Sequence, residues 1–290
     1  MSRSLHILTA KNYSELVIEM YKPEKILTGA PNARDLGGIE TADGRCVKPN
    51  RLIRSGMLAR LTDEDVEYLK SAGLKTVVDF RTSAERVQKP DRQIDNVEYI
   101  VCPMLEDKTE GITRDKPESE DEEAQRTLKM AHHLMATDPD GVRQMRSLYP
   151  ILVTLDHSIE HYRKFFEILL SHEDGVLLYH CTMGKDRVGT ATALLLTALG
   201  VPREGIVADY MITRERCAPG TQRLLNNCRK FTDDEAVLEF VYRLDTVQEN
   251  FIAATFETID EVHGGMDSFL REKMGLDEAS IDRLKALYLE

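Results

Sequence analysis

The chain has 290 residues, of which 42% are hydrophobic and 30% charged, with 17 glycines and 10 prolines. This composition is that of an ordinary globular protein, and it excludes collagen-like, wholly disordered and disulfide-scaffold proteins. The 50 acidic and 38 basic residues give a net charge of −12, which argues against nonspecific binding to nucleic acid or anionic membranes but leaves room for a basic pocket. The length allows one large domain with insertions or two small domains.

Cysteine usage and hydrophobic runs bear on the cellular compartment. The five cysteines are irregularly spaced and form no C-x-x-C pair, so we expect reduced thiols rather than disulfides or a zinc site. The longest weakly polar run, 188–201, has 14 residues, short of the roughly 20 that a transmembrane helix needs. The N-terminus lacks the apolar core of a signal peptide. We expect a cytoplasmic protein without integral membrane association; unconventional secretion stays open.

Strand and helix signals alternate after an opening segment rich in turn-forming residues. Residues 52–53 read as a short strand. A threonine followed by three acidic residues at 62–65 predicts a helix start, and Gly73 predicts its end. Residues 76–80 and 97–102 have the length and composition of strands. Strands separated by helices predict an α/β sheet.

Residues 106–125 differ sharply in charge from the rest of the chain. They hold nine acidic and three basic residues, a net charge of −6 that is half of the total. Such a segment cannot bury enough apolar surface to order itself independently. We expect either a solvated linker or a functional lid, because long loops often serve as lids.

The second half of the chain is mostly helical in pattern. Helical periodicity resumes at residues 159–169, and Gly175 precedes an apolar strand at 176–179. An apolar helix follows at 191–198 and ends at residues 200–202. The patterns from there to the last residue are nearly all helical. The sequence therefore predicts an α/β fold with a central sheet, an inserted segment and a helical C-terminal part.

The segment between the apolar strand and the apolar helix carries the chemistry. Residues 180–189 read HCTMGKDRVG, which places Cys181 at the carboxyl end of a strand and points the next helix back at it, where open α/β sheets bind ligands. Backbone N–H groups and the helix dipole make such a loop an anion cradle, and the same field favours the thiolate. Arg187 can fold its guanidinium over the loop and hold two oxygens of an oxyanion. Together these groups predict attack on a phosphoryl group.

A cysteine six residues before an arginine is a weak signal by itself and occurs twice in this chain. The second instance, Cys217 with Arg223, has no apolar strand before it, and Pro219 removes an amide donor from the segment between them. We interpret that instance as incidental. The first is supported by its strand, its loop glycines, Lys185 and the apolar helix. Its alternative is a buried structural cysteine, Cys181, beside a surface arginine.

The loop closely resembles the H-C-x-x-G-K-D-R-T-G signature of the bacterial tyrosine-protein phosphatases of the atypical, lipid-phosphatase-like type, a family with mycobacterial members. Further segments match the same family, and the similarity covers roughly residues 25–290. These segments are Asn32–Gly38 (NARDLGG), Arg54–Gly56 (RSG), and Asp79–Thr82 (DFRT) with Glu85 and Arg86.

The resemblance implies a cysteine-phosphatase fold over residues 1–290 as a single domain, with a lid insertion at residues 104–148. It implies activity on phosphotyrosine, and in some members on phosphoserine, phosphothreonine or phosphoinositides. The implied mechanism has two steps and needs no metal or other cofactor. The expected partner is a phosphorylated protein or phosphoinositide substrate, and no nucleic acid.

The resemblance also implies roles for the loop residues. The Cys181 thiolate would attack phosphorus and form a cysteinyl-phosphate, and Arg187 with the loop amides would hold the equatorial oxygens. Asp186 would protonate the leaving group, as is proposed for the family's aspartate at that position. The other loop residues expected to bind substrate are Thr182, Met183, Gly184, Lys185 and Val188.

Three residues outside the segment 181–188 are expected to support the loop. His180 resembles the histidine that precedes the nucleophile in the family and orients the loop. Asp79 is the second candidate for the acid, with a helix cap or an ion pair with Arg81 as the alternative. Asp35 is expected either to reach the site as well or, as the favoured alternative, to brace a turn or orient a loop arginine. Lys185 suits doubly phosphorylated or inositide substrates, or it is a solvated lysine that tunes the field at the cysteine.

Two other functions compete with a phosphatase. A phospho-ligand-binding pseudophosphatase with weak turnover has Val188 as its only support. A rhodanese-like sulfur transferase also uses a cysteine loop at the end of a strand, but the G-K-D-R pattern resembles phosphatases more closely.

Val188 stands where the family usually has Thr or Ser, whose hydroxyl can hydrogen-bond the sulfur that leaves in the second step. Its absence should slow hydrolysis of the intermediate more than its formation. We therefore predict that rapid-quench kinetics show a burst of product followed by a modest steady rate. Linear product release without a burst would refute this accumulation of phosphoenzyme.

Overall fold

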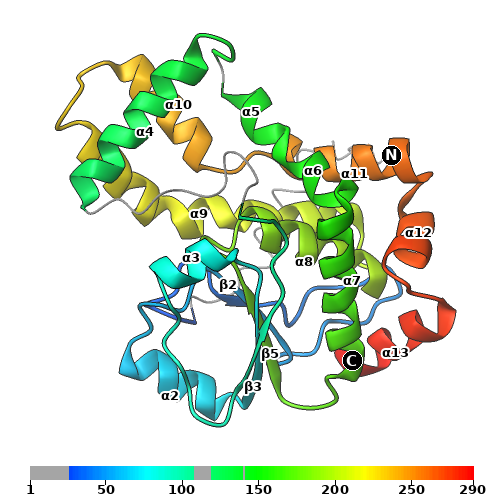
Figure 1. The fold of residues 1–290 in the computed structure, drawn as a ribbon. Coiled ribbons are helices and arrows are strands. Elements are labelled where there is room, and N and C mark those ends of the chain that lie inside the picture. Colours follow the sequence, from blue (N-terminus) through cyan, green and yellow to red (C-terminus); the bar gives the residue numbers. More distant parts are fainter. Residues whose placement is uncertain (1–25, 108–118, 140) are drawn as a thin grey trace, which may run out of the picture.

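The fold is built on a five-stranded sheet in the order β1-β2-β5-β3-β4. Figure 1 shows strands β2, β5 and β3 of this sheet below helices α8 and α9. The structure is a computed structural model and describes residues 26–107, 119–139 and 141–290. Strands β2, β5, β3 and β4 run parallel, and β1 is antiparallel to β2. The α/β prediction is confirmed. The strands are β1 (Arg34–Asp35), β2 (Leu52–Ser55), β3 (Leu74–Asp79), β4 (Glu98–Val101) and β5 (Val176–His180).

Helices surround this sheet and make up the C-terminal part, as predicted. None that the structure describes is long and apolar enough to cross a bilayer. They are α2 (Asp63–Ser71), α3 (Ser83–Gln88), α4 (Glu120–Met135), α5 (Val142–Arg146), α6 (Leu148–Thr154), α7 (Asp156–Ser171), α8 (Asp186–Leu199), α9 (Arg203–Cys228), α10 (Glu235–Asp245), α11 (Glu249–His263), α12 (Met266–Ser268), the π-helical turn η1 (Phe269–Lys273) and α13 (Glu278–Tyr288).

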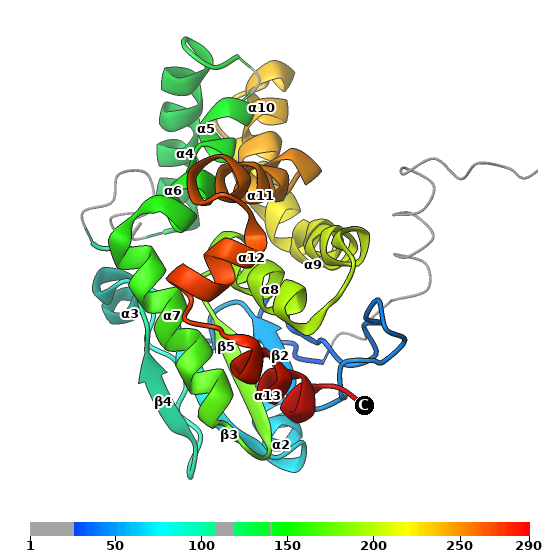
Figure 2. The ribbon, with the colours of Figure 1, turned by 90° about the vertical axis from the view of Figure 1, so that its right-hand side faces the viewer.

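Alternate side chains of β5 pack against the two faces of the sheet. Leu177 and Tyr179 belong to the larger hydrophobic cluster, which includes residues of α7, α8 and α13. Val176 and Leu178 belong to a second cluster with residues of α2. Figure 2 shows α7 and α13 side by side against the sheet. Because both faces are buried, β5 reads as a continuous apolar run, which is typical of parallel strands.

The strand register brings three strand ends to one edge of the sheet. His180, the last residue of β5, is level with Ser55 of β2 and Asp79 of β3. Cys181 follows at once. Since β5 is the central strand, Cys181 lies at the middle of the carboxyl edge, which is where the sequence predicts the site.

Two helices next to this edge begin with a capping box. At α2, the Thr62 hydroxyl accepts from Asp65 N at 3.1 Å, and the Asp65 carboxylate accepts from Thr62 N at 2.9 Å. At α3, Thr82 and Glu85 make the same reciprocal pair, with Thr82 N donating to Glu85 Oε2 at 2.9 Å. Such pairs satisfy backbone donors that a helix start leaves free. The α3 box fixes one oxygen of Glu85.

Helix α4, the C-terminal half of α9, and α10 share a hydrophobic cluster of their own, and we call them the helical arm (Figure 1). Residues 120–125, predicted as linker or lid, are therefore the start of a helix. Ser119 caps α4 and four acidic residues form its first turn, which the helix dipole favours. The arm's cluster is Ala124, Leu128, Ala131, Leu225, Cys228, Val237, Leu238, Phe240, Val241 and Leu244.

The predicted lid insertion, residues 104–148, contains α4 and α5, and residues 108–118 of the acidic segment lie outside the described part of the chain. Its role as a lid stays a prediction.

Cys217 and Arg223 both lie within α9, and Pro219 is inside that helix rather than in a loop. The second cysteine–arginine pair therefore forms no anion-binding loop.

A buried ion triad lies behind the carboxyl edge of the sheet. Arg34 Nε donates to Asp209 Oδ1 at 2.8 Å, and Arg54 Nη1 donates to Asp209 Oδ2 at 2.5 Å. All three side chains are at most 1% exposed. Burial acts to raise the pKa of Asp209, but the two guanidinium groups outweigh it and lower that pKa. The triad ties β1 and β2 to the N-terminal half of α9.

Replacing Asp209 with asparagine should leave two buried guanidinium groups without their counter-charge. We predict that Asp209→Asn lowers the free energy of unfolding by about 3–5 kcal/mol, the usual cost of breaking a buried ion pair by removing one partner. Urea unfolding measures this change. The exposed Asp260→Asn of α11 is the control, with an effect within about 0.5 kcal/mol. Equal effects of the two substitutions would show that the triad contributes no stability.

Candidate active site

The backbone of residues 181–187, here called the cysteine loop, has its carbonyl groups tied to the surrounding protein. The Gly184 carbonyl accepts from Asn32 Nδ2 at 2.6 Å and from Arg54 Nη2 at 2.9 Å. The Thr182 carbonyl accepts from Met57 N at 3.1 Å. Because the C=O and N–H of one peptide unit point in opposite directions, these bonds turn the following N–H groups the other way. The loop is thus arranged as a cradle for an anion.

Gly184 is needed for this backbone path. Its φ is +65°, and a Cβ atom there would lie 2.5 Å from the carbonyl oxygen of Ser55. Both facts exclude a side chain. The predicted contribution of Gly184 is therefore through its backbone, which brings the loop close to the end of β2.

Arg187 is fixed by Glu85 of α3. Its Nη1 donates to Glu85 Oε2 at 2.6 Å and its Nη2 donates to Glu85 Oε1 at 2.8 Å. The Thr182 hydroxyl also donates to Glu85 Oε1. A two-point contact of this kind sets both the position and the plane of a guanidinium. Arg187 is held beside the loop in advance of any ligand.

The electrostatics of this pair follow from burial and hydrogen bonding. Burial alone would raise the pKa of Glu85, but hydrogen bonds from Arg187 and Thr182 lower it to about 2. Burial likewise acts to lower the pKa of Arg187, and Glu85 with Cys181 raises it above its ordinary value. Glu85 is thus ionised and Arg187 charged across the physiological pH range, and the charge of Arg187 acts on Cys181.

Asp186 and Lys185 occupy the junction between the cysteine loop and α8. The Tyr149 hydroxyl donates to Asp186 Oδ1 at 2.5 Å. Lys185 Nζ donates to the Asp245 carbonyl of α10 at 3.1 Å and lies 3.9 Å from Asp186 Oδ2. The Lys185 ammonium is therefore attached to the helical arm rather than solvated.

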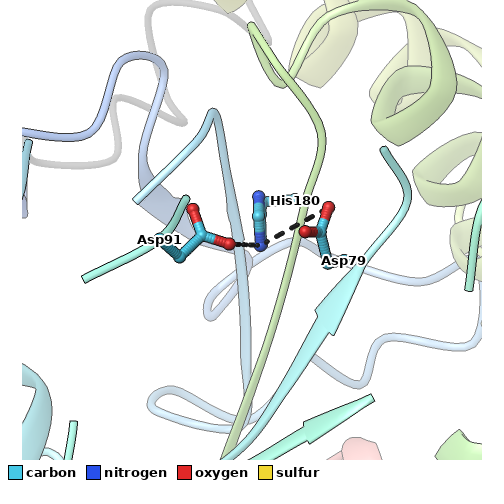
Figure 3. A group of neighbouring side chains, drawn as sticks. All are labelled: Asp79, Asp91 and His180. Atoms are coloured by element: carbon cyan, nitrogen blue, oxygen red, sulfur yellow. Dashed lines mark ion pairs between the residues drawn. The ribbon is translucent and has the colours of Figure 1, made fainter. Parts of the chain in front are cut away.

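His180 lies between two aspartates (Figure 3) and directly precedes Cys181 in the chain. Its Nε2 is 3.2 Å from Asp91 Oδ2 and 3.9 Å from Asp79 Oδ1, and its Nδ1 is 3.4 Å from the Cys181 carbonyl oxygen. Arg81 Nη2 donates to Asp79 Oδ2 at 2.7 Å and to Asp91 Oδ2 at 2.5 Å. The ion pair with Arg81, the alternative weighed for Asp79, is present. This arrangement suits the supporting role predicted for His180.

The same three side chains have the donor types of a metal site. Ligand atoms of Asp79, Asp91 and His180 all lie within 4.8 Å of one another. The Arg81 guanidinium already contacts both carboxylates and supplies the positive charge that a metal ion would bring. Burial acts to raise the pKa of Asp91, but His180 and Arg81 lower it. We interpret the group as a buried ion-pair network.

The remaining predicted residues fall in different places. Asp35 accepts from Gly37 N at 3.0 Å and from Asn50 N at 2.6 Å. It therefore braces a turn, which was the alternative weighed for it. Val188 is fully buried in the main core. The Met183 carbonyl faces the Cys217 thiol at 4.0 Å.

Several partners of the cysteine loop were given no role from the sequence. Glu85 and Asn32 appeared there only as parts of matching segments, and Tyr149, Asp91 and Asp209 had no predicted function. Each is separated from the loop by many residues, and no local spacing links it to Cys181. One sequence signal could have pointed to Glu85: it lies in the capping box of the helix that follows β3, a strand at the border of the site.

A thiol at the end of a central parallel strand, an anion cradle and a fixed arginine are the groups that a cysteine-dependent phosphatase would use. Residues 26–290 match the model of the tyrosine phosphatase family. The chain belongs to this family, and the resemblance and enzyme class predicted from the sequence are confirmed.

Individual relatives agree with this assignment. The chain is 32% identical over 251 residues to a candidate tyrosine-protein phosphatase of Cupriavidus necator, covering 86% of this chain and 84% of that protein. It is 28% identical over 286 residues to the triple-specificity protein phosphatase PtpB of Mycobacterium tuberculosis, covering 91% and 98%. A tyrosine-protein phosphatase of Nostoc commune is 27% identical over 230 residues, covering 72% and 70%.

The low pKa of Glu85 predicts an acid-sensitive contribution to stability. A carboxyl group whose pKa falls on folding from 4.5 to about 2 stabilises the protein fully above pH 4.5 and loses this effect as the pH falls towards 2. Glu85→Gln should therefore lower the free energy of unfolding by about 3 kcal/mol at pH 7, and by about half of that or less near pH 3. Urea unfolding at both pH values measures this. The exposed Glu261→Gln is the control, and a Glu85→Gln effect that is the same at both pH values would contradict the account.

Proposed function

We propose that this protein hydrolyses phosphotyrosine through a cysteinyl-phosphate on Cys181. The observation that carries the proposal is the arrangement of the cysteine loop, with its carbonyls bonded outward and Arg187 fixed by Glu85. Donors that are already in place at the position where charge develops are the main source of transition-state stabilisation in such reactions.

In the first step the Cys181 thiolate attacks phosphorus while the bond to the leaving oxygen breaks. The equatorial oxygens receive hydrogen bonds from the loop amides and Arg187, and Asp186 gives its proton to the leaving oxygen. Asp186 is the better-placed acid because Asp79 is bound by Arg81 and Asp35 by backbone amides.

In the second step water attacks the phosphocysteine, Asp186 accepts a proton from it, and the thiolate leaves. No hydroxyl stands at Val188 to assist this departure. The Thr182 hydroxyl is not a ready substitute, because it donates to Glu85. This supports a second step slower than the first.

The substrates proposed are phosphorylated proteins, with phosphoinositides as a second class. Lys185 supports the second class because its ammonium lies beside Asp186, close enough to the loop to meet another phosphate. A relative is named for triple specificity. The net charge of −12 argues against nucleic acid as a partner, and a cytoplasmic location fits the unpaired cysteines.

Loss of the nucleophile should abolish turnover. We predict that Cys181→Ser lowers kcat for 4-nitrophenyl phosphate by at least about a thousandfold, and that Arg187→Lys, which keeps the charge but not the two-point grip, lowers it by about a hundredfold. Cys46 is the control, because its backbone pairs with Glu290 rather than with the cysteine loop, and Cys46→Ser should keep wild-type activity. Comparison of kcat/KM for phosphotyrosine peptides, phosphoserine peptides and phosphoinositides then ranks the substrates.

The pseudophosphatase alternative predicts a different pattern. In that case wild type and Cys181→Ser bind a phosphotyrosine peptide equally well, and neither releases phosphate above the background rate. That result would overturn the proposed function.

A further inference from the structure

Tyr149, at the start of α6, joins Asp186 to a second tyrosine in the core. Its hydroxyl lies 2.5 Å from Asp186 Oδ1 and 2.5 Å from the hydroxyl of Tyr210 on α9. The two tyrosines are 0% and 1% exposed, and the Asp186 side chain is 20% exposed. Of the three groups, only Asp186 has an edge open to solvent.

Packing fixes both tyrosine rings. The Tyr149 ring stacks on Phe251 of α11 with centroids 5.8 Å apart, and it meets Tyr210 edge-on with centroids 6.2 Å apart. The Tyr210 ring lies so close to α8 that a Cβ atom at Gly189 would be 3.0 Å from it. In a close-packed interior these rings have no room to reorient, so the positions of their hydroxyl oxygens are set.

A proton count gives the direction of the hydrogen bonds. Each tyrosine hydroxyl carries one proton, and an ionised aspartate carries none. Tyr149 uses its proton on Asp186, so the bond between the two hydroxyls must be donated by Tyr210. Burial first, and then the charge of Asp186, raises the pKa of both tyrosines well above the ordinary value. The Tyr210 hydroxyl therefore donates to the Tyr149 hydroxyl, which donates to Asp186 Oδ1.

We propose that Tyr149 is a positioning residue that determines which oxygen of Asp186 carries the proton for the leaving group. Oδ1 accepts the Tyr149 proton, so the transferable proton is on Oδ2, the oxygen on the Lys185 side. This inference rests on the proposed function, in which Asp186 is the acid. The proposal assigns Tyr149 a function at Asp186 that the charges of the site do not explain.

The proton balance is complete in both steps. As the bond from phosphorus to the leaving oxygen breaks, the proton moves from Oδ2 to that oxygen, and the new carboxylate keeps its bond from Tyr149. When water attacks the phosphocysteine, Oδ2 takes a proton from the water and the acid is restored. Tyr149 directly follows residue 148, where the predicted lid insertion ends, so the C-terminal end of that insertion lies next to Asp186.

A series of aryl phosphates tests the proposal, because a positioned acid matters most for poor leaving groups. In Tyr149→Phe, kcat/KM for phenyl phosphate should fall by about tenfold or more, and for 4-nitrophenyl phosphate by less than about threefold. The plot of log kcat/KM against leaving-group pKa becomes steeper. Tyr210→Phe keeps the direct donor, so it should shift the slope the same way by less, and it keeps the proposal testable if Tyr149→Phe does not fold.

Tyr179→Phe is the matched control, because it removes an equally buried hydroxyl, one that contacts Thr192 Oγ1 at 2.8 Å. Its slope should equal that of wild type. Asp186→Asn should give a steep slope that Tyr149→Phe does not change further.

The outcomes separate the two proposals. A wild-type slope in Asp186→Asn would refute Asp186 as the acid and, with it, the proposed mechanism. A steep slope in Asp186→Asn with a wild-type slope in both tyrosine variants would overturn only the role of Tyr149. An equal loss for every substrate in Tyr149→Phe would overturn that role as well, since it indicates a purely structural effect.

Discussion

The buried contact of Asp209 with Arg34 and Arg54 is the constraint on which the rest of the site depends. It joins the N-terminal strands to α9, and Arg54 extends it by donating to the Gly184 carbonyl. Two guanidinium groups share one carboxylate, so the arrangement leaves an excess of positive charge behind the loop. Desolvating these charges is costly unless each is hydrogen-bonded. The network is therefore best explained by the loop geometry that it maintains, with its carbonyls outward and its amides free for an anion.

Two further contacts act on the side chains that face the substrate. Glu85 fixes the plane of Arg187, and Tyr149 fixes the carboxyl group of Asp186. They come from separate elements, one from the capping box of α3 and one from α6, the helix after the predicted lid. The Arg187 cation and the proposed acid, Asp186, are thus oriented by separate elements, and the fold orders them before a substrate binds. Such preorganisation is what makes electrostatic stabilisation effective in a site of this kind.

Local patterns predicted the part of the molecule that depends on neighbours in sequence. The apolar run of β5, the cysteine after it and the glycine-containing loop gave the candidate nucleophile, and the structure places this cysteine at the sheet edge. Contacts between distant segments, such as Glu85 with Arg187, left no periodic signal and could not be predicted. The acidic charge of residues 120–125 was interpreted as a sign of a linker or lid, but acidic residues also suit the first turn of a helix. Pro219 misled similarly, since α9 continues through it.

The central claim is that the cysteine loop is ready for a phosphoryl group before one binds. A crystal structure with orthovanadate, which adopts the geometry of phosphoryl transfer, tests it most directly. The account predicts vanadium bonded to Cys181 Sγ, its equatorial oxygens on the loop amides and Arg187, and the backbone of residues 181–187 within about 1 Å of the position described. Loop carbonyls turned inward in the vanadate-free crystal, or Arg187 leaving Glu85 to reach the anion, would contradict it.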